Sequence, residues 1–325
     1  MYMNILNITN IKGGMEWKRV KNSRLLGMRT LSHGIYKKNK YFNTHRPIII
    51  DPENEKDSSF NLCKQHHPDR LKWLINKFFR SDAKQAHQII NRYIGSDKDI
   101  YKHLIELYKK NHSDETTPDI NEQRKGVATT KLNHIKEFLD DYKKDHQNPF
   151  NNILEIGCED CFQIKEIGRY LGIVNEKEDT YNCLNIENWN DSGYGSKRDT
   201  CNFKIYDGEH IPYRDDSFDV VIIFQTLHHV EFNIDLYVAD IQRIIRKGGI
   251  LIIREHNCED PYFNKLIDIE HGLYGVVRDD NPKYFDKYYG EYRSEKQWDE
   301  IIGMNKLYSL RIPTATNSYY AIYKK

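Results

Sequence analysis

The second half of the chain alternates short apolar runs with stretches of helical periodicity. Runs rich in β-branched residues predict five strands, at residues 152–156, 180–187, 202–207, 218–225 and 250–255. Segments 161–174 and 236–247 between them carry apolar side chains at helical spacing. Strands that are buried on both faces and separated by helices form parallel sheets, so we expect a doubly wound α/β domain with a mostly parallel sheet.

The end of the chain predicts an addition to this sheet. A last helix is expected at residues 297–303, and two further apolar runs at 307–313 and 318–325 predict a closing antiparallel hairpin. The Gly248-Gly249 pair follows the predicted helix 236–247, and we expect it to stop that helix.

The first half of the chain has a different pattern. Its apolar residues recur at helical spacing in four amphipathic segments, at residues 67–80, 83–94, 99–111 and 129–144. Residues 113–126 are polar and rich in turn formers, which predicts a connector. We therefore divide the chain into residues 1–50, a helical extension at 51–149 and the α/β domain at 150–325.

Charge is distributed unevenly along the chain. The formal net charge is +1, but residues 1–50 contain ten Lys or Arg and one acid, Glu16, so this segment carries +9 and the remainder −8. A basic arm indicates an anionic partner such as RNA, while a solvated, partly disordered leader is the alternative interpretation. No apolar run approaches the roughly 18 residues of a membrane span, and no secretion signal is visible, so we expect a soluble, cytoplasmic protein.

The six cysteines do not have the spacing of a disulfide or zinc framework. Cys158 and Cys161 form a C-x-x-C pair, but no second pair has matching spacing, and we expect no metal site. A redox pair at the turn into a helix is the alternative, because a helix N-terminus lowers the pKa of a thiol.

Polar residues stand where the predicted strands end. In an open parallel sheet, ligands bind beyond the carboxyl ends of the strands. The first four ends carry Glu155 and Gly157, then Asn185 and Glu187, then Asp207, and then the segment Phe224–Val230. The fifth strand ends at "REHN", residues 254–257.

Four segments in order resemble class I S-adenosylmethionine-dependent methyltransferases. They are "YDGEHIPYRDDSFDVVIIFQTLHHV", "IQRIIRKGGILIIRE", "YRSEKQWDEIIGM" and "YYAIYKK". The resemblance covers roughly residues 150–325 and implies a Rossmann-like fold, S-adenosyl-L-methionine as cofactor and methyl transfer as activity. The general look of the chain is similar to methyltransferase-like proteins of large DNA viruses that replicate in the cytoplasm.

The resemblance also implies site residues. Glu155 would orient the amino group of the cofactor's methionine part, Asn185 or Glu187 would hold the ribose, and Asp207 would accept a hydrogen bond from adenine. The full cofactor-binding set is Glu155, Gly157, Cys158, Glu159, Asn185, Glu187, Asp207, Gly208, Glu209, Phe224 and Gln225. On the acceptor side, the resemblance points to His228, Glu255 and His256.

The sequence departs from the family at the loop after the first strand. Family members have glycines at three alternating positions, whereas here Glu159 and Cys161 replace the second and third. The strand-end residues also have structural interpretations. Glu155 could cap the following helix, Asp207 could form a turn, and His228-His229 could be a packed pair.

Several acceptors fit these features. Methyl transfer from a sulfonium depends mainly on positioning, so no nucleophile motif is needed. The basic arm and the tyrosine-rich region around residues 268–298 favour RNA, including an mRNA cap, because aromatic side chains stack on bases. The alternatives are a small-molecule methyltransferase and a catalytically silent subunit that binds RNA or a partner enzyme. The Asn-Pro-Pro-Tyr motif of DNA amino methylation is absent, which disfavours that reaction.

Overall fold

We describe a computed structural model of the chain, which defines residues 58–92, 96–112, 120–145, 150–158, 161–173, 180–186, 201–231, 233–277 and 290–325. The basic residues 1–50 and two predicted site residues, Glu159 and Glu187, lie outside these ranges.

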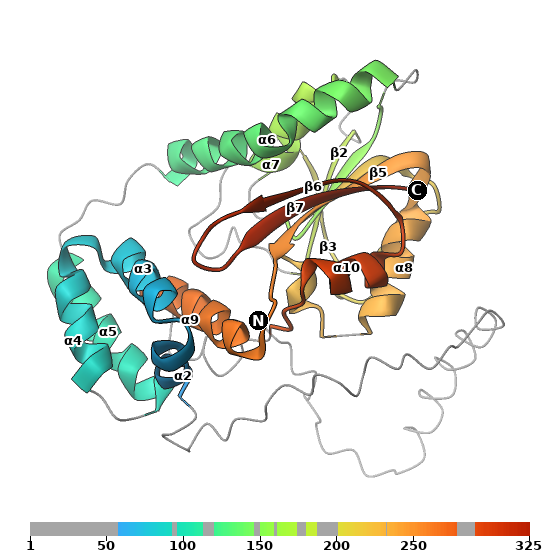
Figure 1. The fold of residues 1–325 in the computed structure, drawn as a ribbon. Helices are drawn as coiled ribbons and strands as arrows, with labels where there is room; N and C mark the ends of the chain where they lie inside the picture. The colour runs from blue at the N-terminus through green and yellow to red at the C-terminus, as the bar shows by residue number, and fades with distance from the viewer. Residues whose placement is uncertain are drawn as a thin grey trace, which may run out of the picture. The chain divides into compact units, whose positions relative to one another are not determined.

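A seven-stranded sheet forms the centre of the α/β part, in the order β3-β2-β1-β4-β5-β7-β6 (Figure 1). Neighbours among β1 to β5 are parallel, and β7 runs antiparallel to both β5 and β6. This architecture confirms the predicted doubly wound, mostly parallel sheet with its closing hairpin. The strands are β1 (Ile153–Ile156), β2 (Tyr181–Asn185), β3 (Asn202–Ile205), β4 (Phe218–Phe224), β5 (Ile245–His256), β6 (Asn305–Ile312) and β7 (Ser318–Lys324).

Helices cover both faces of this sheet because its central strands are apolar on both sides. On one face, α6 (Ile120–Asp145) and α7 (Phe162–Tyr170) lie side by side (Figure 1) and share a core with alternate residues of β1, β4 and β5. On the other face, α8 (Ile234–Ile244) and α10 (Glu295–Ile302) pack on the intervening residues of the same strands. In β1, for example, Ile153 belongs to the first core and Leu154 to the second.

A third core lies among helices from distant parts of the chain. Helix α9 (Pro261–Val277) contacts three N-terminal helices, α2 (Ser59–His66), α3 (Pro68–Phe79) and α5 (Asp97–His112), as Figure 1 shows. The 3-10 turn Arg80–Asp82 links α3 to α4 (Ala83–Arg92). Gly272 of α9 permits close packing, because a Cβ at this position would lie 2.3 Å from Oη of Tyr101.

Side chains of α3 also hold this helical part to the sheet hairpin. Arg70 donates hydrogen bonds from Nη1 to the carbonyl oxygens of Thr314 and Ala315, at 3.1 and 3.0 Å. Lys77 pairs with the buried carboxylate of Glu270 at 2.9 Å, and Glu270 in turn accepts a hydrogen bond from Thr316. The division of the chain at residue 150 stays a prediction.

Several predicted element boundaries were wrong. Helix α6 begins at Ile120, so the second half of the predicted connector 113–126 is helical. Helix α8 ends at Ile244, and Gly248-Gly249 lies within β5, where the pairing with β4 shifts register. A Cβ on Gly249 would lie 2.8 Å from the carbonyl oxygen of Asp219, so close strand approach selects this glycine. Helices α2 and α9 were not predicted.

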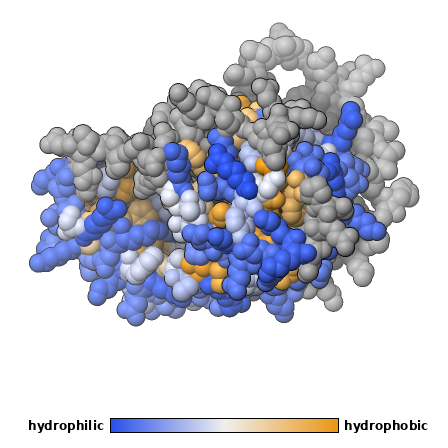
Figure 2. Space-filling model, turned by 90° about the horizontal axis from the view of Figure 1, so that it is seen from above, coloured by the Kyte–Doolittle hydropathy of each residue, from blue (hydrophilic) through white to orange (hydrophobic). Residues whose placement is uncertain are grey.

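The surface is mainly polar. Figure 2 shows hydrophilic residues over most of one face, with smaller hydrophobic groups between them. Among the helices that the structure describes, none combines the length and apolar character that a membrane crossing requires.

Candidate active site

Glu155 at the end of β1 caps the following helix. Its side chain is almost fully buried, at 2% exposure, and Oε2 accepts a hydrogen bond from the backbone N–H of Ile164 at 3.2 Å. Its Oε1 accepts from Nε2 of Gln163 at 3.0 Å, and Lys131 of α6 donates to Oε1 of Gln163 at 2.5 Å. The helix-capping interpretation of Glu155 therefore describes its contacts, and the contribution of Lys131 was not predicted.

Gly157 turns the chain away from β1 with a left-handed backbone, at φ +80°. A Cβ at this position would lie 2.1 Å from Oγ1 of Thr226, so the bare backbone makes room for the loop after β4. The backbone N–H of Gly157 donates to the carbonyl oxygen of Leu184 at 2.8 Å, which ties this loop to β2.

Asn185 at the end of β2 is turned towards the same loop. It is 8% exposed, and its Nδ2 donates to the carbonyl oxygen of Cys158 at 2.9 Å. Its Oδ1 accepts from the N–H of Ile186, whose apolar side chain is 47% exposed. The amide of Asn185 thus connects the first two strand ends.

Asp207 after β3 presents a carboxylate to solvent. Its side chain is 59% exposed, and Oδ1 accepts from the backbone N–H groups of Glu209 and His210 at 2.9 and 2.8 Å. Partial burial raises the pKa of Asp207, but the N–H groups of His210 and Glu209 outweigh it and lower this pKa overall. Gly208 has φ +82°, and a Cβ there would lie 3.1 Å from Cγ2 of Ile186.

Phe224 and Gln225 at the end of β4 have different surroundings. Phe224 is buried against Tyr320, with Lys131 placing its ammonium 5.6 Å from the ring centroid. Gln225 has a left-handed backbone, at φ +50°, and its Oε1 accepts a hydrogen bond from Arg254 at 2.6 Å. Its Nε2 lies 3.4 Å from Nε2 of His256.

The fold brings His228 and Glu255 together as a fully buried pair. Nδ1 of His228 lies 2.6 Å from Oε2 of Glu255, while Oε1 accepts from the N–H groups of Thr226 and Leu227 at 3.1 and 2.9 Å. Both residues were predicted on the acceptor side, but their contact was not predicted. Since a carboxylate only accepts, Nδ1 carries the proton and the lone pair stands on Nε2.

Nε2 of His228 is buried and has no hydrogen-bond partner among the residues that the structure describes. Burial, together with the neighbouring His229 and His271, lowers the pKa of His228 well below its usual value. Burial also raises the pKa of Glu255. The imidazole is therefore neutral near pH 7.

More aromatic and imidazole rings surround this pair. His228 has ring centroids of His256, His271 and Tyr292 at 5.3, 5.4 and 5.3 Å. Burial lowers the pKa of both His256 and His271 to about 4. His271 and Tyr292 were not predicted as site residues, although both lie in the tyrosine-rich region around residues 268–298. We call His228, His229, His256 and His271 the histidine cluster.

Part of the histidine cluster has the spacing of a metal site. One nitrogen each of His228, His229 and His271 lie within 4.8 Å of one another. The carboxylate of Glu255 on the other nitrogen of His228 is the arrangement that commonly orients a metal-binding histidine.

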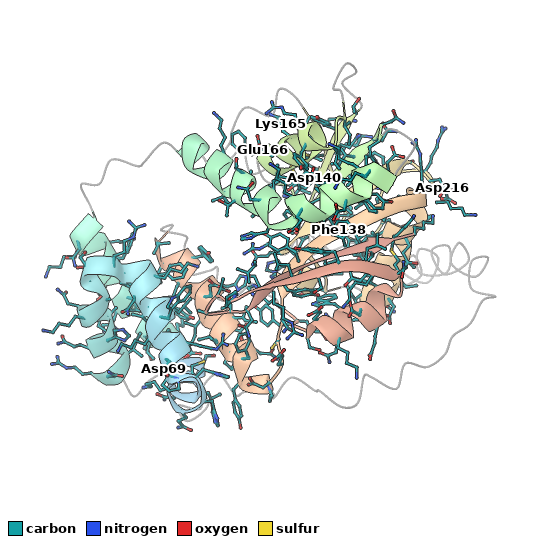
Figure 3. All side chains as sticks on the ribbon, turned by 45° about the horizontal axis from the view of Figure 1, so that its top comes forward. Asp69, Phe138, Asp140, Lys165, Glu166 and Asp216 are labelled. Carbon is teal, nitrogen blue, oxygen red and sulfur yellow. The ribbon has the colours of Figure 1, made fainter. Side chains whose placement is uncertain are left out.

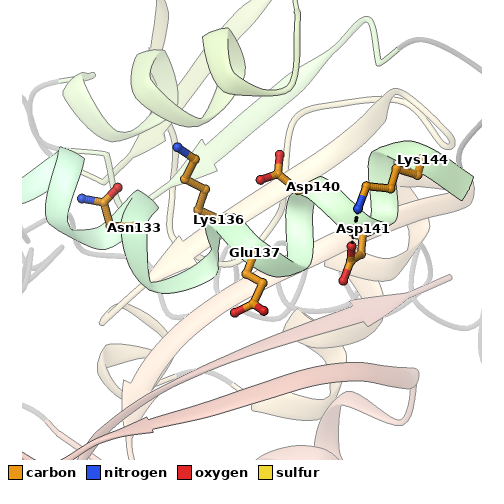
Figure 4. Close-up of a pocket in the computed structure, with 6 residues that line it drawn as sticks. All are labelled: Asn133, Lys136, Glu137, Asp140, Asp141 and Lys144. Carbon is orange, nitrogen blue, oxygen red and sulfur yellow. Dashed lines mark hydrogen bonds and ion pairs between the residues drawn. The ribbon is translucent and has the colours of Figure 1, made fainter.

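A surface hollow on α6 carries none of these groups. It is lined by Asn133, Lys136, Glu137, Asp140, Asp141 and Lys144, all on one helix, and Lys144 pairs with Asp141 at 2.8 Å (Figure 4). Since the predicted site residues stand at strand ends, we place the active site there.

Comparison with known proteins identifies the kind of domain. Residues 154–253 match the family model described as "Methyltransferase domain". This segment runs from β1 through the body of β5 and includes the first four strand ends described above. Residues 154–253 of the chain therefore carry a methyltransferase domain. The predicted enzyme class and the predicted cofactor, S-adenosylmethionine, are thereby confirmed.

Solved structures similar to the methyltransferase come from several organisms. The PH0226 protein of Pyrococcus horikoshii OT3 is 14% identical, with 66% of this chain and 98% of that chain covered and a TM-score of 0.41. A SAM-dependent methyltransferase of Aquifex aeolicus is 13% identical, with 64% and 98% covered and a TM-score of 0.36. A putative methyltransferase of Haloferax volcanii, in complex with the Trm112 activator, is 11% identical, with 64% and 97% covered and a TM-score of 0.39. No curated protein matches the sequence.

Proposed function

We propose that this methyltransferase methylates RNA and that the His228–Glu255 pair takes up the proton that the acceptor atom releases. The observation that carries the proposal is the buried Nε2 of His228, which holds a lone pair because Glu255 fixes the proton on Nδ1. A hydroxyl or amino group that gains a methyl group must lose a proton, and a positioned histidine is the most common group to accept it. The ionised Glu255 would then stabilise the imidazolium that forms.

The strand ends also fit the cofactor. Gly208 leaves bare, left-handed backbone beside the solvent-exposed carboxylate of Asp207 and the exposed side chain of Ile186, and Gly157 does so at the end of β1. We assign the adenosine end to Asp207, Gly208 and Ile186, because a carboxylate accepts hydrogen bonds from an amino group. S-adenosylmethionine supplies the methyl group on its sulfonium. The remaining predicted cofactor residues keep their assignment as part of this proposal: Glu155, Gly157, Cys158, Glu159, Asn185, Glu187, Glu209, Phe224 and Gln225.

RNA as acceptor is supported by charge. Residues 1–50 carry +9, and binding a polyanion with such a segment releases counterions from the nucleic acid. Affinity for RNA is therefore expected to fall steeply as salt rises. A small uncharged acceptor would show no such dependence.

The first experiment is a calorimetric titration with S-adenosylmethionine and with S-adenosylhomocysteine. We expect binding that is lost in Asp207→Ala and kept in Asp141→Ala, an exposed carboxylate on α6 that serves as the matched control. Absence of binding by both ligands would favour the catalytically silent alternative and would overturn the proposal.

A second experiment tests the acceptor. Capped RNA, uncapped RNA and small nucleosides are offered to the full chain, and S-adenosylhomocysteine formation is measured at several salt concentrations. Replacing the ten Lys and Arg of residues 1–50 by Gln should abolish the salt dependence, whereas replacing Lys102, Lys109 and Lys110 of α5 should preserve it. Turnover of a small acceptor alone would exclude RNA as the substrate.

A further inference from the structure

Four of the six cysteines meet at one place in the fold. Cys158 and Cys161 lie in the turn from β1 to α7, Cys183 lies in β2, and Cys201 directly precedes β3. The sulfur atoms of the first three all lie within 4.8 Å of one another. Cys201 stands outside this group of three, but Cys161 and Cys183 are near enough to shift the pKa of its thiol. We call these four residues the thiol cluster.

We propose that the thiol cluster binds one zinc ion. Four cysteine sulfurs in a closed arrangement form the usual structural zinc site, with Zn–S distances of about 2.3 Å and tetrahedral geometry. Such a tetrahedron separates its sulfurs by roughly 3.8 Å. The Sγ atoms of Cys158 and Cys161 are 3.8 Å apart, and those of Cys161 and Cys183 are 3.4 Å apart.

One distance departs from this geometry. The Sγ atoms of Cys158 and Cys183 are 2.7 Å apart, which lies between the zinc spacing and the disulfide bond length of about 2.05 Å. A side-chain movement of about 1 Å restores the zinc spacing. A disulfide would join only two of the sulfurs, whereas zinc accounts for the convergence of the three innermost sulfurs and would take Cys201 as its fourth ligand.

The thiol cluster is largely enclosed by the protein. Cys158, Cys161 and Cys183 have no exposed surface, and Cys201 is half-buried. Lys165 of α7, labelled in Figure 3, adds a positive charge near Cys161. A bound zinc ion would supply the charge that lets buried thiols ionise.

The location suggests what the metal stabilises. Cys161 stands at the N-cap of α7 with φ +61° and has no side-chain capping hydrogen bond. A left-handed backbone strains a residue with a Cβ, so this conformation needs support from its surroundings. Zinc bound by both loop cysteines would fasten the turn after Gly157 to β2 and to the start of β3. It would thereby fix a loop that lacks two of the family's three glycines.

The spacing of the cysteines along the chain therefore does not exclude a zinc site. Cys158 and Cys161 supply one close pair, but Cys183 and Cys201 are separated by the chain between β2 and β3 and do not form a C-x-x-C. Parallel pairing of β2 with both β1 and β3 brings them to the first pair.

The proposal can be tested on the full chain without measuring methyl transfer. We expect one zinc ion per chain by elemental analysis after dialysis, released when a mercurial reagent modifies the thiols. Cobalt substitution should give the intense visible bands and the sulfur-to-metal charge transfer of a tetrahedral tetrathiolate site.

Three results would overturn it. The first is a chain without metal in which all six thiols are reactive after denaturation. The second is a denatured, chelated chain with only four reactive thiols, which indicates a disulfide. The third is a cobalt spectrum without sulfur charge transfer, which would place the metal on the histidine cluster instead.

Variants identify the ligands. Cys183→Ser and Cys201→Ser should lose the metal, whereas Cys258→Ser, at a buried cysteine outside the thiol cluster, should retain it. Cys201→Ser is the milder change because this side chain is only half-buried. If a variant fails to fold, the cobalt spectrum of the unaltered chain still decides between sulfur and nitrogen ligands.

Discussion

The thiol cluster and the histidine cluster both lie at the parallel sheet and are largely buried. They differ in how accessible their side chains are. The three innermost sulfurs of the thiol cluster are without exposed surface and lie against each other. The histidine cluster combines the unpartnered Nε2 of His228 with an exposed member, His229. Structural metal sites are closed and reactive sites keep an open position. This criterion supports the two proposals, a structural role for the thiol cluster and a catalytic role for the histidine cluster.

The largest expected effect separates the two clusters by activity. We expect His228→Ala to lower kcat by a factor of about 10² to 10⁴, because a general base contributes about that much. His66→Ala, at an exposed histidine of α2 outside the histidine cluster, is the control and should change kcat far less. Rates of S-adenosylhomocysteine formation measure both. Equal losses in the two variants would contradict the role of His228.

The second effect distinguishes the two clusters by zinc, which we propose that only the thiol cluster binds. Chelation of zinc should lower the free energy of unfolding by about 4 kcal/mol relative to protein with free zinc a thousandfold above its Kd. Thermal unfolding with and without a chelator measures this loss. In Cys183→Ser the chelator should have no further effect, whereas in His271→Gln it should act as in the unaltered chain. A chelator effect that depends on His271 would reverse the comparison.

The third effect is a pH dependence of the free energy of unfolding, which we expect from the histidine cluster and not from the thiol cluster. Burial lowers the pKa of His256 and His271 from 6.5 to about 4, so between these values the unfolded chain binds more protons than the folded one. Stability from these groups is therefore complete above pH 6.5 and is lost as pH falls towards 4. Each contributes up to about 1.4 kcal/mol per pH unit.

This slope is measured as a difference between variants. Glu255 and Asp268 have raised pKa values and oppose the histidines, but they are common to both proteins in a comparison of the unaltered chain with His271→Gln. We expect the variant to lose less stability between pH 6.5 and 5 in urea unfolding. His66→Gln, at an exposed histidine of α2, is the control. Parallel curves for all three would refute the expectation.

The smallest effect concerns the loop that carries the thiol cluster. Gly157 and Gly172 both have left-handed backbones, at φ +80° and +77°, but only at Gly157 would a Cβ meet another side chain. Gly172→Ala measures the backbone strain alone, and Gly157→Ala should cost about 1–3 kcal/mol more because of the contact with Thr226. Urea unfolding gives both values. Adding Thr226→Ala should recover part of this difference, and no recovery would place its origin elsewhere.

Most of the elements and their order follow from local patterns in the sequence. Apolar runs rich in β-branched residues predicted β1 to β5, because the tendency to form a strand depends on residues that are close in the sequence. The polar residues at the ends of these runs indicated one edge of the sheet. The same local signal identified the amphipathic helices α3, α4 and α5. It missed α9, whose burial among the N-terminal helices does not follow from local periodicity.

Which side chains meet could be seen only in the three-dimensional fold. His228 acquires its carboxylate from the next strand, Gly157 is required by Thr226, and the C-x-x-C of Cys158 gains Cys183 and Cys201 from two other strands. These contacts join residues far apart in the chain. They depend on the register of parallel strands, which the spacing of residues along a single sequence does not contain.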